Sequence, residues 1–457
     1  MKRISHCRAC GSAALTPAFT LDGAVSSAGR KGLLGRAKSE AAEFVLCDPT
    51  RDVHACGLLQ NAHASDGPVK RTAPSGVFRV TRSALRAMAT EGLELISGRD
   101  CAALDIGCSD GTLLSFYPRW VDRYGVDPSD DIDGLGAWTW TAKAAFPGPD
   151  IDRAFAGKKF DLITAASTLE EVDEPRAFLA RVKSLLTPDG VFCLETLYAP
   201  MALTHTAADT FASGVSAVYS LTVLERLLRD CDLKVFRGAL TEKDGGSIRL
   251  FVTHAESPEY DFDPWYERLA QLWDEENALG LRSISPYQAF SARAGELRAA
   301  FQEKLAELAK RGQSVHLFGT DAGAAMFHAW AGPKAAIIEA AVSAAEFDEG
   351  ARLLPGGPAI ITEQESRAVN PDCLIAPSAL KREILERWRD YVLQGGKVLF
   401  VTPEVHVVTA ANYAGEFGKS LAGAGGGAGA ESLRSILKAA GGLRVVGGKD
   451  AKNAASA

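Results

Sequence analysis

A nucleoside could be bound by four residues in the segment CAALDIGCSDGTLLSFYPRWVDRYGVDPS. Gly107 and Gly111 allow a sharp turn and a close approach to a ligand, because glycine has no Cβ. Asp105 ends an apolar run before this turn, and Asp127 follows a second short apolar run. In open α/β sheets an acid at that place hydrogen-bonds the ribose. The pattern therefore predicts a strand, a glycine turn, a helix from Thr112 and a second strand.

The same segment disfavours two kinds of ligand. It contains neither G-x-G-x-x-G nor G-x-x-x-x-G-K-[ST], the signatures of dinucleotide and triphosphate cradles. A D-x-G-x-x-x-G turn with a distant acid instead resembles the S-adenosylmethionine site of class I methyltransferases, and an ordinary strand-to-helix turn is the alternative. The resemblance implies a set of cofactor-binding residues in the two turns and at the end of a later strand: Asp105, Gly107, Cys108, Ser109, Asp110, Gly111, Asp127, Pro128 and Ala166.

Four of the nine cysteines fall in the first 56 residues. Cys7 and Cys10 have the spacing of a zinc knuckle, and Cys47 and Cys56 form a second, unusually wide pair. Two thiolate pairs can complete a tetrahedral Zn²⁺ site, which stabilises a small domain with few apolar residues. Since all four ligands come from the protein, the zinc would be structural and not catalytic. A metal-free loop is the alternative, and three nearby histidines are alternative ligands: His6, His54 and His63.

Composition limits the class of protein. A chain of 457 residues is too long for one ordinary domain, so two or three are expected. The net charge of −7 and the lack of a Lys/Arg-rich run argue against a nucleic-acid partner. No apolar run approaches about 18 residues, which excludes a transmembrane helix. The N-terminus MKRISHCRAC lacks the apolar stretch of a secretory signal, so we expect a cytoplasmic protein with reduced thiols.

Periodicity and turn residues divide the chain into four parts. They are a zinc-binding domain (1–75, ending in a polar linker from 66), a Rossmann-like class I methyltransferase domain (76–256), a second, smaller α/β domain (257–409), and a low-complexity linker and tail (410–457). In the methyltransferase domain the sequence predicts helices at 81–96, from 175 and at 221–229, strands at 160–166, 191–195, 233–237 and 247–253, and a turn at 187–190. In the third part it predicts helices at 263–281, 286–311 and 380–393, and strands at 314–320, 372–376, 397–402 and ending at Ile338. In the tail it predicts one short helix at 431–440.

The order of the motifs resembles that of the three-domain sugar C-methyltransferases. These proteins combine a zinc-binding N-terminal domain, a class I methyltransferase domain and a C-terminal domain. The matching motifs span roughly residues 1 to 408 and are ACGLLQ from 55, LDIGCSDGTLL from 104, FDLITAAS from 160, TPDGVFCLE from 187, YSLTVLERLL from 219, GGSIRLFV from 245, VHLFGT from 315, NPD from 370 and GGKVLFVTPE from 395.

Five segments depart from the family pattern, all of them tied in the family to substrate or catalysis. Y-W-Y-R-S-G is replaced by residues 71–76, E-H-V by 170–172, D-T-x-x-H-E-H by 209–215, G-A-S-T-K-G by 319–324 and P-W-H by 377–379. Forming a carbanion beside a carbonyl needs a base with a pKa near neutrality. Ser213, Gly214 and Val215 cannot supply one, so this chain is a divergent member that lacks the family's catalytic histidines and tyrosines.

We therefore expect a methyltransferase acting at oxygen or nitrogen of a sugar-nucleotide or related polar small molecule. A hydroxyl acceptor would need a general base, and Glu171 is the candidate, with a solvated loop carboxylate as the alternative. His205 and Tyr219 are interpreted as structural, and Cys108 is expected to pack against the cofactor. The alternative function is a non-catalytic S-adenosylmethionine-binding paralogue that acts as a partner or regulatory subunit, and pairing with a paralogue or self-association would accompany it.

Overall fold

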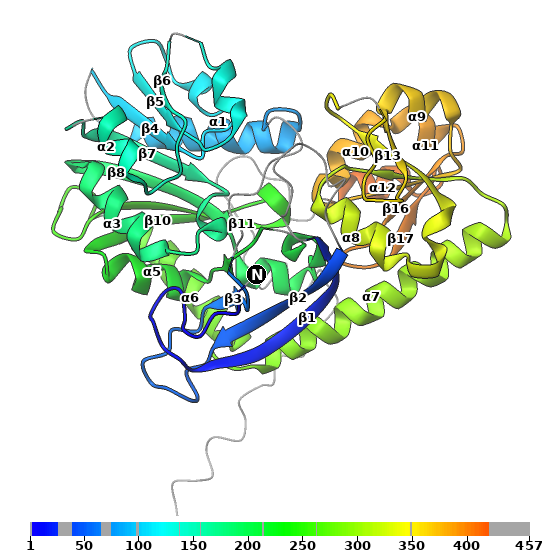
Figure 1. Ribbon diagram of the computed structural model, residues 1–457, viewed down its shortest axis with the longest axis horizontal. Helices are drawn as coiled ribbons and strands as arrows, with labels where there is room; N and C mark the ends of the chain where they lie inside the picture. Colours follow the sequence, from blue (N-terminus) through cyan, green and yellow to red (C-terminus); the bar gives the residue numbers. More distant parts are fainter. Residues whose placement is uncertain are drawn as a thin grey trace, which may run out of the picture.

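The computed structural model describes residues 2–25, 39–64, 75–96, 100–136, 138–155, 157–212, 214–261, 263–347 and 350–419. Within these ranges the chain forms three β-sheets and the helices that cover them (Figure 1). The tail beyond residue 419, its expected helix at 431–440 and nearly all of the expected linker at 66–75 lie outside the described residues.

The central sheet has seven strands in the order β10-β11-β8-β7-β4-β5-β6. They are β4 (Ala102–Ile106), β5 (Asp122–Val126), β6 (Trp140–Ala142), β7 (Phe160–Ala166), β8 (Leu186–Leu197), β10 (Leu233–Thr241) and β11 (Ser247–His254). All neighbours are parallel except that β11 runs antiparallel to β8 and β10. The strand order reverses at β4, which lies between β5 and β7. Doubly wound sheets bind ligands outside the carboxyl ends of their strands at such a reversal.

Successive residues of the central strands point to opposite faces, and helices cover both faces. Ala103 of β4 belongs to the core under α1 (Arg79–Glu94). Its neighbour Leu104 belongs to the opposite core, which includes α3 (Pro175–Leu185) and α5 (Leu221–Arg229). Burial on both faces explains why these strands read as continuous apolar runs in the sequence.

Two expected elements of this part are wrong. The helix from Thr112 is replaced by a single 3₁₀ turn, η1 (Leu114–Phe116). Pro118 restricts the residue before it, and Tyr117 accordingly has extended backbone with ψ 139°, so no helix can continue. The turn expected at 187–190 is part of β8, which begins at Leu186 and passes through a register shift in its pairing with β7.

A second sheet joins the N-terminal residues to the middle of the chain. Its strands are all antiparallel: β1 (Leu15–Val25), β2 (Ser39–Cys47), β3 (Leu59–Asn61) and β9 (Ala217–Val218). Phe19 and Phe44 stack with ring centroids 5.0 Å apart and pack against Phe211 and Phe290. The N-terminal residues therefore have more apolar core than expected, and β1 packs against α7 (Ser285–Lys310) and α8 (Ala322–Trp330) (Figure 1).

The third sheet has six strands in the order β14-β13-β12-β15-β16-β17. They are β12 (Val315–Phe318), β13 (Ile338–Ser343), β14 (Ala359–Thr362), β15 (Cys373–Ala376), β16 (Lys397–Phe400) and β17 (His406–Val408). Only β17 is antiparallel to its neighbour, and the strand order reverses at β12. The helix α6 (Asp263–Leu279) packs against β10 and α5 of the central part. The described helices that follow it are α7 (Ser285–Lys310), α8 (Ala322–Trp330), α9 (Glu363–Val369), α10 (Lys381–Arg387), α11 (Arg389–Leu393) and α12 (Tyr413–Gly418).

Three expectations for this third part are corrected. The strand expected to end at Ile338 begins there, because residues 332–337 form a 3₁₀ helix. The helix expected at 380–393 is broken at Trp388 into α10 and α11. The expected low-complexity region from 410 contains α12, where Glu416 pairs with Lys381 of α10 at 2.6 Å.

The predicted α/β class is confirmed as a doubly wound central sheet with a second, smaller parallel sheet beside it. Among the described helices none is both long and apolar enough to cross a membrane.

Candidate functional site

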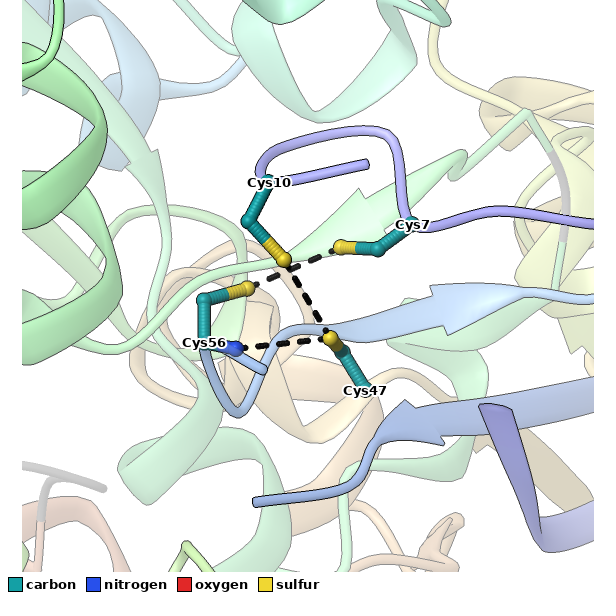
Figure 2. Close-up of side chains that lie close together, drawn as sticks. All are labelled: Cys7, Cys10, Cys47 and Cys56. Carbon is teal, nitrogen blue, oxygen red and sulfur yellow. Dashed lines mark hydrogen bonds between the residues drawn. The ribbon is translucent and has the colours of Figure 1, made fainter. Parts of the chain in front are cut away.

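The four N-terminal cysteines converge on one point (Figure 2). Cys7 Sγ lies 3.6 Å from Cys56 Sγ, and Cys10 Sγ lies 3.5 Å from Cys47 Sγ. All four sulfur atoms lie within 4.8 Å of one another. The three histidines considered as alternative ligands, His6, His54 and His63, are not part of this cluster.

The wide spacing of the second cysteine pair is explained by a β-hairpin. Cys47 ends β2 and Cys56 precedes β3, and these two strands pair antiparallel. The backbone N–H of Cys47 donates to Leu58, and the N–H of Gly57 donates back to Cys47. The eight residues between the cysteines are therefore the hairpin loop, whose ends are adjacent.

The sulfur positions suit a four-coordinate zinc ion. Zn–S bonds of about 2.3 Å in a tetrahedron place sulfur atoms ~3.8 Å apart. The separations of 3.5 and 3.6 Å lie close to this value, and the donor set of four thiols is one that structural zinc sites use.

The second candidate site is a pocket of about 330 Å³ at the carboxyl ends of β4 and β7, where the central sheet reverses. Four of the predicted cofactor residues line it: Asp105, Gly107, Cys108 and Ala166. The other five lie on the loops after β4 and β5 and are not among its lining: Ser109, Asp110, Gly111, Asp127 and Pro128. Six lining residues were not predicted: Ser75, Thr81, Leu85, Thr112, Leu113 and Lys243.

Two buried aspartates are held by donors around this pocket. Asp105 Oδ1 accepts a hydrogen bond from Thr164 Oγ1 at 2.7 Å. Asp127, which is 8% exposed, accepts from the backbone N–H groups of Ser109 at 2.9 Å and Ser129 at 2.8 Å. Each carboxylate oxygen can accept more than one hydrogen bond, so Asp127 keeps capacity for a ligand.

The loop after β4 has the backbone that close approach requires. Gly107 has φ +76°, and a Cβ added there would lie 2.4 Å from Thr168 Oγ1. Ser109 follows with φ +47°, an uncommon conformation for a residue with a side chain and one that clusters at functional sites. Burial raises the pKa of the Cys108 thiol well above its ordinary value, so this group stays protonated at neutral pH.

A second pocket, of about 270 Å³, lies where the central part of the chain meets the C-terminal part. Four separate segments line it: the loop after α4 (Ala199–Thr204) with η4 (Ala208–Phe211), η5 (Lys243–Gly245), η7 (Ser378–Leu380), and the loop after β16. The lining residues are His205, Ala207, Asp209, Thr210, Asp244, Gly245, Ser378, Ala379, Thr402 and Pro403.

The turn η5 separates the two pockets. Lys243 lines the first pocket, and Asp244 and Gly245 line the second. Lys243, which is 2% exposed, pairs with Asp244 and donates to Ser167 Oγ. Ser167 donates to Asp244 Oδ2 at 2.6 Å. One hydrogen-bonded cluster thus forms the wall between two adjacent pockets.

Glu171, the predicted base, lies at the end of η3 (Leu169–Glu171) and lines neither pocket. Its neighbour Glu170 is buried and accepts from Thr196 Oγ1 at 2.8 Å, and burial raises the pKa of this carboxyl. Ser213 lies outside the described residues.

Comparisons with known proteins agree with this two-part arrangement. A family described as a methyltransferase domain matches residues 79–237, and one described as the C-methyltransferase C-terminal domain matches 242–403. The C-methyltransferase NovU of Streptomyces niveus is 23% identical over 314 residues, which cover 67% of this chain and 73% of that protein. The ubiquinone biosynthesis O-methyltransferase of Rhodopseudomonas palustris (strain TIE-1) is 26% identical over 136 residues, 28% of this chain and 53% of that protein.

Solved structures were also compared. A S-adenosylmethionine-dependent methyltransferase from Clostridium acetobutylicum ATCC 824 has a TM-score of 0.31 at 16% identity, covering 38% of this chain and 93% of that chain. Magnesium protoporphyrin IX methyltransferase from Synechocystis PCC 6803 with bound SAH has a TM-score of 0.30 at 17% identity, covering 38% of this chain and 82% of that chain. The two family matches meet between residues 237 and 242, just before the turn that separates the two pockets.

Proposed function

We propose a reaction for this chain, which belongs to the S-adenosylmethionine-dependent methyltransferases that carry a C-methyltransferase C-terminal domain. The chain transfers the methyl group of S-adenosylmethionine to oxygen or nitrogen of a polar small molecule. A nucleotide-linked sugar is the first class of acceptor to test. The observation that carries this proposal is the position of the second pocket, which lies directly across η5 from the pocket at the end of β4.

The first pocket is the proposed cofactor site. Asp127 would accept hydrogen bonds from the ribose hydroxyls, as acids at this place do in related sheets. Gly107 lets the backbone approach the ligand, and Cys108 packs against it as an uncharged thiol. Bound S-adenosylmethionine would supply an electrophilic methyl group, so the rest of the site has only to position the acceptor and take up a proton.

Methylation at oxygen or nitrogen is favoured over methylation at carbon by the residues of the segment 209–215. Carbanion formation needs a strong base and a partner for the enolate, and this segment ends in Gly214 and Val215, which offer neither. A hydroxyl or amine needs only a proton acceptor while positioning does the rest.

The test is transfer of labelled methyl groups from S-adenosylmethionine into a low-molecular-mass cell extract. Purified protein is expected to label a polar product, and Asp127→Ala is expected to reduce the label when S-adenosylmethionine is limiting. NMR of the product made with ¹³C-methyl-labelled S-adenosylmethionine then distinguishes O-methyl and N-methyl groups from C-methyl groups by the chemical shift of the transferred carbon. Cofactor binding without any labelled product would contradict the reaction and favour a non-catalytic binding subunit, alone or paired with a paralogue.

We further propose that Cys7, Cys10, Cys47 and Cys56 hold one structural Zn²⁺. All four ligands would be protein thiolates, so the ion has no open position for catalysis. Elemental analysis is expected to give one zinc per chain, lost in a Cys7→Ser, Cys10→Ser double variant. Cys231→Ser, a cysteine outside the cluster, is the matched control and should keep the metal. Protein prepared without chelator that contains no zinc would overturn this assignment.

The domain boundaries at 75/76, 256/257 and 409/410 stay proposals. Residues 65–74, just before the first of them, lie outside the described residues. The strand β9, which comes after this boundary in the chain, completes the N-terminal sheet.

A further inference from the structure

We propose that His205 and Asp209 are the proton-accepting end of the acceptor site. His205 takes the proton of the hydroxyl or amine that is methylated, and the carboxylate of Asp209 favours the imidazolium that forms. This inference rests on the proposed function and names the residues that would serve it.

His205 is a buried polar group in need of a partner. It is 5% exposed and lines the second pocket. Its Nδ1 atom has no hydrogen-bond partner among the residues that the structure describes. Buried nitrogen atoms are rarely left unpaired in folded proteins, because a buried polar group without a hydrogen bond lowers stability. A ligand in the pocket would satisfy this atom.

The protonation states suit the two roles. Burial lowers the pKa of His205 below its ordinary value, although a hydrogen bond with the backbone of Gly245 opposes this effect. The imidazole is therefore neutral at pH 7 and can accept a proton. Burial raises the pKa of Asp209 to about 6, so most of this carboxyl is ionised at the same pH.

The charged groups around the pair leave the pocket acidic. Asp244 is paired with Lys243 on η5, so its charge is largely balanced. Asp321, at the start of α8, adds a negative charge that contributes to the raised pKa of Asp209. Arg293 of α7 faces the other side of this region, where it donates to Thr206 Oγ1 and the backbone oxygen of Leu203. An acidic pocket favours a group that donates hydrogen bonds, so the hydroxyl-bearing sugar of a nucleotide-linked acceptor would occupy it and the phosphates would lie outside.

The position of the pair matches a transfer from the first pocket. His205 and Asp209 lie on the acceptor side of η5, whose Lys243 lines the cofactor side. In the proposed step the acceptor's lone pair forms the new bond to the methyl carbon. The carbon–sulfur bond breaks with its electron pair on sulfur, which leaves neutral S-adenosylhomocysteine. The proton of the acceptor passes to His205 and then to solvent.

From the sequence His205 is interpreted as structural, although it lies near the altered segment 209–215. The pocket is assembled from segments near residues 205–210, 244–245, 378–379 and 402–403, which are far apart in the chain.

The test compares His205→Gln and Asp209→Asn with His254→Gln in the full chain. His254 also has an unpartnered, buried Nδ1 among the described residues but lines neither pocket, so its variant controls for loss of a buried imidazole. Labelled transfer into the small-molecule extract should fall about 100-fold or more in His205→Gln, the usual contribution of a general base. The affinity for S-adenosylmethionine should stay within about twofold in all three variants, since none touches the first pocket.

The pH profile separates a base from a structural residue. Transfer by the wild-type chain should fall as the pH drops through about 6 and below, where Asp209 and His205 become protonated. In Asp209→Asn the maximal rate of transfer should fall. The decrease of the rate at low pH would then depend on His205 alone, so the pH of its midpoint should change. Transfer by His205→Gln at the wild-type rate, or with an unchanged decrease at low pH, would overturn the proposal.

Nitrogen-15 spectra of the histidine rings give a readout that does not need turnover. The resonance missing in His205→Gln identifies His205, and it should move when the extract is added to the S-adenosylhomocysteine complex. If the wild-type chain labels no product and the His205 resonance does not move when the extract is added, the assignment of the acceptor site is wrong. If the wild-type chain does not bind S-adenosylmethionine, the proposed function fails instead.

Discussion

The two pockets on either side of η5 hold their acids in opposite ways. On the cofactor side, Asp127 accepts hydrogen bonds from two backbone N–H groups at 2.9 and 2.8 Å. On the acceptor side, Asp209 has the backbone N–H groups of its own turn, and burial beside Asp321 raises its pKa to about 6. The hydrogen bonds of Asp127 stabilise its carboxylate in the folded protein, whereas the burial of Asp209 lowers the stability of the folded protein. Such a cost is typical of a group that is kept for chemistry.

The two doubly wound sheets repeat this contrast in the loops after their first strands. The loop after β4 has Gly107 at φ +76° and opens onto the cofactor pocket. The loop after β12 has Gly319 at φ +117°, and Asp321 there caps α8 by accepting from the N–H of Ala324 at 2.9 Å. The protein's own carboxylate thus fills a position where a helix start would otherwise attract an anion. The loop after β4 is thus open to a ligand, whereas the loop after β12 is occupied by the protein's own carboxylate.

The difference between the two loops is tested most directly by adding one methyl group to each of them. Gly107→Ala should weaken S-adenosylmethionine binding by roughly 100-fold or more, because the new Cβ would lie 2.4 Å from Thr168 Oγ1 at a backbone angle that alanine disfavours. Gly319→Ala should leave the affinity within about twofold, although its new Cβ would lie 3.1 Å from Ala324. Calorimetric titration checks both. Equal losses in the two variants would mean that general destabilisation, and not the pocket, decides the affinity.

Much of the cofactor side was predictable because its signal is local. Gly107, Gly111 and Asp127 lie on one strand–turn–strand segment, and their spacing alone indicates the site. The cysteine cluster was predictable from the Cys7–Cys10 spacing, although only the hairpin explains the distance from Cys47 to Cys56.

The acceptor side was not predictable for the opposite reason. Its residues come from separate parts of the chain, and Glu171 was chosen from an aligned position that lines neither pocket. The helix expected from Thr112 failed because a proline six residues later outweighs the apolar pattern.

A second change tests whether Asp127 is part of the cofactor site. Asp127→Ala should weaken S-adenosylmethionine binding by about 1–3 kcal/mol and should also lower stability, because the N–H groups of Ser109 and Ser129 lose their acceptor. Asp133→Ala is the matched control, since this exposed acid lies on the same loop and pairs with Lys143 at the surface. Calorimetry and thermal unfolding measure the two effects. An unchanged affinity in Asp127→Ala would contradict the assignment.

Removing the charge of Asp209 on the acceptor side should raise the stability of the protein, whereas removing that of Asp127 should lower it. A carboxyl whose pKa is raised by folding destabilises the folded state above that pKa, and the penalty disappears as the pH falls through about 6 towards the ordinary value of 3.8. Asp209→Asn should therefore stabilise the protein at pH 7 by on the order of 1 kcal/mol after solvent screening. The gain should vanish near pH 4. Thermal unfolding at both values checks it, and a loss of stability at pH 7 would show that Asp209 is an ordinary structural acid.

The most direct test of the account is a calorimetric titration of S-adenosylmethionine into the wild-type chain, repeated with S-adenosylhomocysteine already bound. We predict one binding site per chain, and the product should compete for it. No measurable binding, or binding that the product does not displace, would contradict the assignment of the pocket at the end of β4.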